Sequence, residues 1–285
     1  MEQVTIANDA LTVTVSPLGA EMQSLVTADG RNWLWSGDPA VWSGRAPILF
    51  PMVGRAPDDQ VSIEGKRYGM NQHGFARRSG FALAERSATA CRFVLEASEV
   101  TRAVYPFAFG LSVAYRLDER AVVVTAEVEN RDHRPMPFGI GFHPAFAWPL
   151  PGAMGPHRVW LDNGGEPALV RLSGGLVKPE RLASPFHDGE LTLERAMFEA
   201  DAMLFPEGAG AGARYGTDDQ QVHLSWENLP NFAVWSKPGP FVCLEPWHGT
   251  AAEVGGSDAL EERPYTEVLG PGAVGRYAMW VELVG

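Results

Sequence analysis

Three parts of the sequence place ionisable side chains among apolar, glycine and proline residues. They are PILFPMVGRAP at 47–57 with MNQHGFARR at 70–78, FGIGFHPAFAWP at 138–149, and FVCLEPWHG at 241–249. Core packing does not require ionisable groups in such settings, because burying a charge costs free energy unless it is paired. The candidates for catalytic or binding residues are therefore Arg55, His73, Arg77, His143 and Glu245.

Glu245 is the sharpest of these candidates, since it follows the apolar run FVCL and precedes Pro246 and Trp247. Burial raises the pKa of a carboxyl group, so that the group can take up a proton near neutral pH. The alternative interpretation is a carboxylate at the rim of the fold, just past a strand end and paired with an arginine.

The two histidines supply a second kind of proton-exchanging group. His143 lies in GFHPAF, and imidazole exchanges a proton near pH 7 without a large pKa shift. His73 precedes Gly74, which allows close backbone approach, and Arg77 adds a fork of hydrogen-bond donors. Taken singly, each histidine also fits a hydrogen-bonded residue of the core.

The sequence lacks the motifs of several other chemistries. Its histidines show none of the H-x-H, H-x-x-H or HExxH spacings of zinc sites, and it has no GxSxG elbow and no phosphate-binding loop. Cys91 and Cys243 lie far apart, without CxxC spacing, and are expected as reduced, buried residues of strands. We therefore expect acid–base chemistry without a metal or a cofactor.

The charge of the chain excludes further classes of function. Among 285 residues, 23 basic and 35 acidic side chains give a formal charge of −12. This charge repels nucleic-acid phosphates and anionic membrane surfaces, and no basic patch offsets it. The N-terminus alternates like a strand rather than a signal peptide, and no apolar run of about 18 residues is present. We expect a cytoplasmic protein with neither nucleic-acid nor membrane partners.

Nine tryptophans add an aromatic component. Aromatic faces stack on the C–H faces of sugar rings, which suits carbohydrate binding, although most tryptophans are expected in the core or in strand pairs. A pocket with a carboxylate, two imidazoles and one or two arginines suits proton exchange on a polyhydroxylated small molecule.

Strands must position these residues, because period-2 alternation recurs along the chain and helical periodicity is almost absent. Helical turns are expected only at 98–107 and 179–184, a hairpin at 118–120, and a flexible loop at 207–219. About sixteen to twenty short strands are expected, in two large antiparallel sheets packed face to face. No linker divides residues 1–285, so one domain is the economical interpretation. The expected strands include 11–15, 81–88, 91–97, 111–117, 121–130, 222–226, 232–236 and 277–284.

The chain resembles the aldose 1-epimerase, or galactose mutarotase-like, superfamily over nearly its whole length. The resemblance rests above all on HGFAR, GFHPAF and LEPW in this order and spacing, and also on SPLGAEMQSL at 16–25, LFPMVGR and YPFAFGLSVAYRL. It implies an all-β fold, the antiparallel β-supersandwich, with few short helices and a site on the concave face of one sheet.

The resemblance also implies an activity, the interconversion of the α and β anomers of an aldose. By this resemblance Glu245 is the general base on the anomeric hydroxyl, and His143 is the general acid that protonates the ring oxygen. His73 holds the substrate and assists the acid, whereas Arg55 and Asp201 contact the sugar. The Asp201 match is the loosest, because its flanking sequence FEADAMLF is less distinctive.

Two branches of the superfamily compete for the substrate. QHGFAR resembles the branch acting on hexose 6-phosphates, in which the equivalents of Gln72 and Arg77 contact the ligand. GFHPAF resembles proteins linked with bacterial lactose and galactose use, and we favour an unphosphorylated aldose. The alternatives are a hexose 6-phosphate, a non-catalytic sugar-binding domain, and a glycoside hydrolase using Glu245 with Asp201. A monomer or a homodimer is expected.

Overall fold

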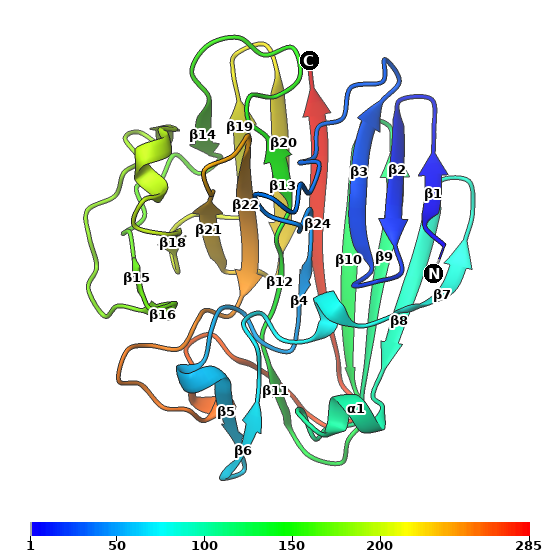
Figure 1. Ribbon diagram of the computed structural model, residues 1–285, viewed down its shortest axis with the longest axis vertical. Coiled ribbons are helices and arrows are strands. Elements are labelled where there is room, and N and C mark those ends of the chain that lie inside the picture. The colour runs from blue at the N-terminus through cyan, green and yellow to red at the C-terminus, as the bar shows by residue number, and fades with distance from the viewer. Residues whose placement is uncertain (1) are drawn as a thin grey trace.

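The computed structural model describes residues 2–285 and is built mainly of strands, with short helical turns (Figure 1). The first twelve strands are β1 (Val4–Ala7), β2 (Leu11–Ser16), β3 (Glu21–Thr27), β4 (Ile48–Leu49), β5 (Gln60–Ile63), β6 (Lys66–Gly69), β7 (Ala82–Arg86), β8 (Ala90–Glu96), β9 (Phe109–Asp118), β10 (Ala121–Asn130), β11 (Met136–Phe138) and β12 (Ile140–Phe142). The others are β13 (Ala145–Ala147), β14 (Arg158–Leu161), β15 (Leu172–Ser173), β16 (Leu176–Val177), β17 (Glu190–Thr192), β18 (Met203–Phe205), β19 (Gly212–Gly216), β20 (Gln221–Glu227), β21 (Asn231–Trp235), β22 (Phe241–His248), β23 (Glu267–Leu269) and β24 (Val274–Val284). The helical turns are α1 (Glu99–Arg102), η1 (Pro57–Asp59), η2 (Ala76–Arg78), η3 (Arg195–Phe198) and η4 (Leu260–Glu262).

Nine strands form the larger sheet, in the order β17-β14-β19-β20-β24-β10-β9-β8-β7. Its central strand is β24, which pairs with β10. Strands β9 and β10 form a hairpin, in which Asp118 pairs with Ala121 across the turn predicted from the sequence. Strands β8 and β9 alternate between buried and more exposed side chains, as expected for a sheet with one face on the core.

The smaller sheet carries six strands, in the order β18-β21-β22-β12-β4, and β13 also pairs with β22. Along β22, Val242 and Leu244 point into the main apolar cluster, which also takes side chains from β2, β9, β10 and β24. The alternate residues Cys243 and Trp247 belong to two smaller clusters on the opposite face. Because successive strand residues point to opposite faces, Glu245 projects away from the main core, on the side of Cys243 and Trp247.

The three-stranded sheet β1-β2-β3 lies at the other side of the molecule from β15, β16 and β18 (Figure 1). It packs onto the larger sheet, since its hydrophobic residues share the main cluster with β8–β10. The hydroxyl of Tyr115 on β9 also donates a hydrogen bond to the carbonyl oxygen of Ala20, beside β3, at 2.7 Å. The expected all-β, supersandwich-type fold is confirmed.

Two predictions about strands and loops are wrong. The strands number more than sixteen to twenty, because two- and three-residue strands such as β4 and β15 are too short to show periodicity. The expected loop at 207–219 contains β19, whose Ala213 and Tyr215 are fully buried. The glycines there have structural reasons: Gly208 and Gly210 have positive φ values of 86° and 79°, and a Cβ on Gly212 would collide with the Asp162 carboxylate.

The segment 179–184 forms no helix. Leu182 instead makes an antiparallel bridge to Leu169, and Pro185 disfavours helical geometry in the residue before it. Both cysteines are free, buried thiols on β8 and β22, as expected. Within residues 2–285, no helix is long and apolar enough to cross a membrane.

Candidate functional site

A cavity of about 540 Å³ opens on the face of the six-stranded sheet that points away from the main core. Strand β22 supplies Glu245, the loop between β12 and β13 supplies His143, and the segment after β6 supplies His73 and Arg77. The structure therefore brings together residues that are far apart in the sequence. The predicted residues that line this cavity are Gln72, His73, Arg77, His143, Asp201 and Glu245.

Glu245 and His143 form the centre of the site. Glu245 Oε2 lies 3.1 Å from His143 Nε2, and the two residues are only 1% and 5% exposed. Despite this distance, Oε2 makes no well-oriented hydrogen bond with any described residue, and neither does His143 Nδ1. A buried carboxylate oxygen and a buried ring nitrogen are thus left free beside a cavity, which is typical of groups that act on a ligand.

Burial has opposite effects on the two groups. It raises the pKa of Glu245 well above its ordinary value, although the nearby Arg77 opposes this shift. Burial, and after it the neighbouring His73 and Arg77, lowers the pKa of His143 well below its ordinary value. Both shifts favour the uncharged forms, a protonated carboxyl group on Glu245 and a neutral imidazole on His143.

His73 is held by its backbone and ring together. Its N–H donates to the Gly54 carbonyl oxygen at 2.8 Å, and the Gly54 N–H donates to His73 Nδ1 at 3.1 Å. A backbone N–H can only donate, so Nδ1 accepts and Nε2 carries the ring proton. Burial, with Arg77 and Arg78, lowers the pKa of His73 to about 3. His73 is therefore neutral, and its Nε2 lies 3.3 Å from the side-chain amide of Gln72.

The turn that carries His73 explains the glycine after it. His73 and Gly74 both have positive φ, at 66° and 71°. A Cβ at Gly74 would lie 2.2 Å from the carbonyl oxygen of Phe50, the residue after β4. Only glycine therefore allows this turn to lie so close to the end of β4.

Tryptophans enclose His143, and the sequence analysis did not select them individually. The Trp42 ring stacks on the imidazole, with centroids 5.1 Å apart, and the Trp235 ring meets it edge-on at 5.6 Å. Trp247, on β22, completes the aromatic lining. The high tryptophan content was the available signal, but it did not tell core tryptophans such as Trp33 from those of the site.

Arg55 does not line the cavity. Its guanidinium is held in a two-pronged ion pair, with Nε 2.8 Å and Nη2 2.9 Å from the Asp59 carboxylate oxygens. The i,i+4 carboxylate thus engages the Arg55 side chain, and its contact with the sugar stays a prediction.

Three other cations do line the cavity: Arg77, Arg78 and Lys237. None of them forms an ion pair or a side-chain hydrogen bond with any of residues 2–285. Several exposed arginines are paired with a carboxylate, as Arg131 is with Glu96. What distinguishes the cavity is that three cations without such a partner gather in it, in an acidic chain.

Asp201 also lies on the cavity wall, in the turn between η3 and β18. Its backbone has a positive φ of 67°, and its Oδ1 accepts a hydrogen bond from the N–H of Ala202 at 2.8 Å. The neighbouring Glu199 lines the cavity too and was not predicted. Asp201 remains a candidate for sugar contact.

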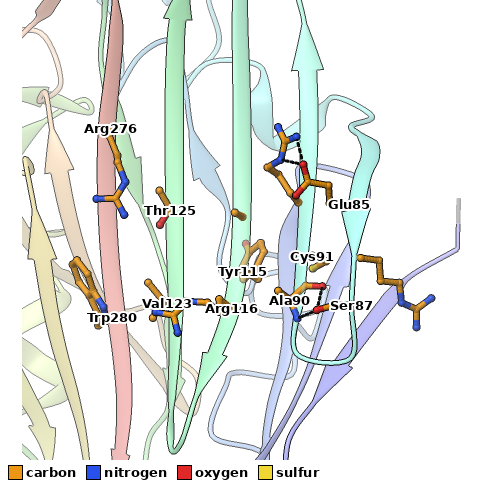
Figure 2. Close-up of a pocket in the computed structure, with 13 residues that line it drawn as sticks. Glu85, Ser87, Ala90, Cys91, Tyr115, Arg116, Val123, Thr125, Arg276 and Trp280 are labelled. Carbon is orange, nitrogen blue, oxygen red and sulfur yellow. Dashed lines mark hydrogen bonds and ion pairs between the residues drawn. The ribbon is translucent and has the colours of Figure 1, made fainter.

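A second cavity, of about 660 Å³, lies on the outer face of the nine-stranded sheet (Figure 2). It is lined from β7, β8, β9, β10 and β24 and contains none of the predicted site residues. Three of its arginines are neutralised by carboxylates, so it lacks the free acid–base groups of the first cavity. The pairs are Arg92–Glu85, Arg116–Asp118 and Arg276–Glu227.

Comparison with known proteins bears on this site. A family model described as aldose 1-epimerase matches residues 2–167. The chromosomal protein LacX of Lactococcus lactis is 28% identical over 287 residues, which cover 93% of this chain and 94% of that protein.

Solved structures extend the similarity to the fold. A galactose mutarotase related enzyme from Lactobacillus acidophilus superposes with a TM-score of 0.92 at 28% identity, covering 100% of this chain and 98% of the other. A galactose mutarotase-like protein from Lactobacillus casei gives a TM-score of 0.91 at 28% identity, covering 99% and 100%. A putative aldose 1-epimerase from Escherichia coli, at 17% identity, covers 99% and 98% with a TM-score of 0.77, which is a likeness of fold alone.

Proposed function

Because the chain belongs to the aldose 1-epimerase family, we propose that it interconverts the α and β anomers of a hexose by opening and reclosing the sugar ring. The observation that carries this proposal is the buried, mutually adjacent pair Glu245 and His143, with a free oxygen and a free nitrogen beside the cavity.

The spacing of the pair fits the reaction. Ring opening needs one group to remove the proton of the anomeric hydroxyl and another to protonate the ring oxygen. These two oxygens are bonded to the same carbon atom, so the two catalytic groups must lie next to each other. The 3.1 Å separation of Glu245 Oε2 and His143 Nε2 meets this requirement.

The proposed cycle begins with the carboxyl proton of Glu245. On sugar binding it passes from Glu245 to His143 across their contact, and the charge of Arg77 favours the resulting carboxylate. Glu245 takes the proton of the anomeric hydroxyl while His143 gives its proton to the ring oxygen, which breaks the bond from C1 to the ring oxygen. After rotation about the C1–C2 bond, the reverse transfers close the ring to the other anomer.

His73 has a supporting role in this scheme. Its Nε2–H group donates to the substrate or to a bound intermediate, while its low pKa prevents it from acting as a competing proton store near pH 7. The tryptophans around His143 exclude water and offer faces for the sugar ring.

Polarimetry tests the proposal. Freshly dissolved α-D-glucose and α-D-galactose are followed with and without the protein, and the expected result is faster approach to the equilibrium rotation. Sugar binding without acceleration would contradict the proposal and support a non-catalytic carbohydrate-binding domain.

A second candidate is the same reaction on a hexose 6-phosphate, favoured by the unneutralised Arg77, Arg78 and Lys237. Guanidinium and ammonium groups form strong, charge-assisted hydrogen bonds with phosphate oxygens. Anomer exchange of glucose 6-phosphate and galactose 6-phosphate, measured by NMR beside the neutral sugars, separates the two. Acceleration of the phosphate esters alone would assign the three cations to a phosphate subsite, and acceleration of the neutral sugars alone would not.

A further inference from the structure

A sulfur atom lies beside the Glu245–His143 pair and takes no part in the proposed reaction. Cys243 and Glu245 are alternate residues of β22, so their side chains project from the same face of the sheet. One potential ligand atom from each of His143, Cys243 and Glu245 lies within 4.8 Å of the other two, and all three residues are buried. Sequence spacing could not show this cluster, since His143 comes from a different part of the chain.

The cluster has the composition of a site for a thiophilic cation. Thiolate sulfur, imidazole nitrogen and carboxylate oxygen are the ligands that Zn²⁺ uses in proteins. His143 Nδ1 and Glu245 Oε2 have no hydrogen-bond partner in the part of the chain that the structure describes, so these atoms are available to a cation. Trp35 and Phe241 pack against Cys243 in one apolar cluster, and this low-dielectric cover strengthens a bond between opposite charges.

We propose that Cys243, His143 and Glu245 form an inhibitory binding site for a thiophilic divalent cation such as Zn²⁺. The cation enters through the cavity, whose wall includes His143 and Glu245, and bonds to these two residues and to the Cys243 sulfur. The protons of the Cys243 thiol and the Glu245 carboxyl group pass to solvent. Bonds of about 2.3 Å to sulfur and about 2.0–2.1 Å to nitrogen require small side-chain rotations of Cys243 and Glu245 to draw the ligands together.

The inhibitory part of this inference rests on the proposed function, because the cation would occupy both members of the acid–base pair. Binding of the cation does not depend on that function. A spectroscopic measurement of binding therefore tests the cation site separately from the proposed anomer exchange.

The binding test uses Co²⁺ as a coloured substitute for Zn²⁺ on the chain of residues 1–285. A thiolate–Co²⁺ charge-transfer band in the near ultraviolet and strong visible bands of a tetrahedral site are expected, and Zn²⁺ should displace them. Cys243→Ala should abolish the charge-transfer band. Cys91→Ala, which removes the other buried thiol on β8, should leave it unchanged and is the matched control.

The activity test measures anomer exchange against Zn²⁺ concentration, with reversal by a chelator. Loss of even an outer-shell partner weakens metal binding by about 10–100-fold, so Cys243→Ala should raise the inhibitory Zn²⁺ concentration by at least about 100-fold, and Cys91→Ala should not change it. Absence of the charge-transfer band in the unmodified protein, or equal Zn²⁺ sensitivity of Cys243→Ala, would overturn the proposal. A Cys243-dependent band in a protein without anomer exchange would uphold the site and contradict the proposed function.

Discussion

At the scale of single residues, the position of Glu245 within β22 decides its chemistry. It lies inside the strand, 1% exposed, and not at a solvated rim, so the alternative of a rim carboxylate paired with an arginine is wrong. His143 is likewise buried, but its free Nδ1 and its stacking on Trp42 distinguish it from a hydrogen-bonded core histidine.

The prediction at this scale concerns the proton-transfer pair. Glu245→Gln and His143→Asn keep the approximate shape of each side chain but remove its proton exchange, so each is expected to lower kcat for anomer exchange by at least about 100-fold. Glu227→Gln, which changes an exposed carboxylate on β20, is the matched control and should leave kcat unchanged. Near-normal turnover in Glu245→Gln would contradict the proposed mechanism.

At the scale of structural elements, a buried arginine holds the cavity wall together. Arg263 is 6% exposed, and its Nη2 donates to the carbonyl oxygens of Thr250 at 2.7 Å and Val53 at 3.1 Å. Within residues 2–285 it has no carboxylate partner, and burial lowers its pKa to about 10. Arg263 therefore joins the segment that holds His73, through Gly54, to the loop after β22.

The prediction at this scale is that Arg263→Met loosens this wall. Buried carbonyl oxygens would lose their donor, so the free energy of unfolding should fall by at least about 1–3 kcal/mol. KM should rise more than kcat falls, because His73, which we propose to contact substrate, is held through Gly54 while Glu245 and His143 remain fixed by the six-stranded sheet. Steady-state kinetics and urea unfolding measure the two effects.

Two further variants separate positioning from general destabilisation. Arg263→Lys retains a donor and should recover part of the KM effect. Arg67→Met, which removes an exposed ion pair with Asp258, should change neither KM nor stability appreciably. A fall in kcat as large as the rise in KM in Arg263→Met, with no recovery in Arg263→Lys, would argue against a positioning role.

At the scale of the whole molecule, buried neutral histidines link folding to pH. The pKa of His73 is about 3 in the folded protein, against an ordinary value of 6.5. Between these values the unfolded chain binds the proton and the folded chain does not, so stability is complete above pH 6.5 and falls as the pH is lowered.

The prediction at this scale compares unfolding free energies at about pH 7.5 and about pH 5. One proton contributes about 1.4 kcal/mol per pH unit, so His73→Gln should reduce the stability lost between these two conditions by about 2 kcal/mol. Urea unfolding measures the change, and His187→Gln, at an exposed position, is the control. An unchanged pH dependence in His73→Gln would show that His73 is protonated in the folded protein.

The sequence by itself determined the class of fold and the ingredients of the site. Alternation with period 2 is local, so β2, β8, β9, β10, β20, β21 and β24 could be predicted from their own residues, as could the β9–β10 hairpin. Ionisable residues within apolar runs also stand out locally, which is why Glu245, His143, His73 and Arg77 were found without any knowledge of their neighbours.

Only the tertiary structure decided which of these residues meet. Pairing across strands sets which residues face one another, and that register depends on contacts between distant parts of the chain. It put Glu245 beside His143, added Cys243, Trp42, Arg78 and Lys237 to them, and paired Arg55 with Asp59. Very short strands and β19 were equally invisible in the sequence, because partners across the sheet, and not their own periodicity, hold them in place.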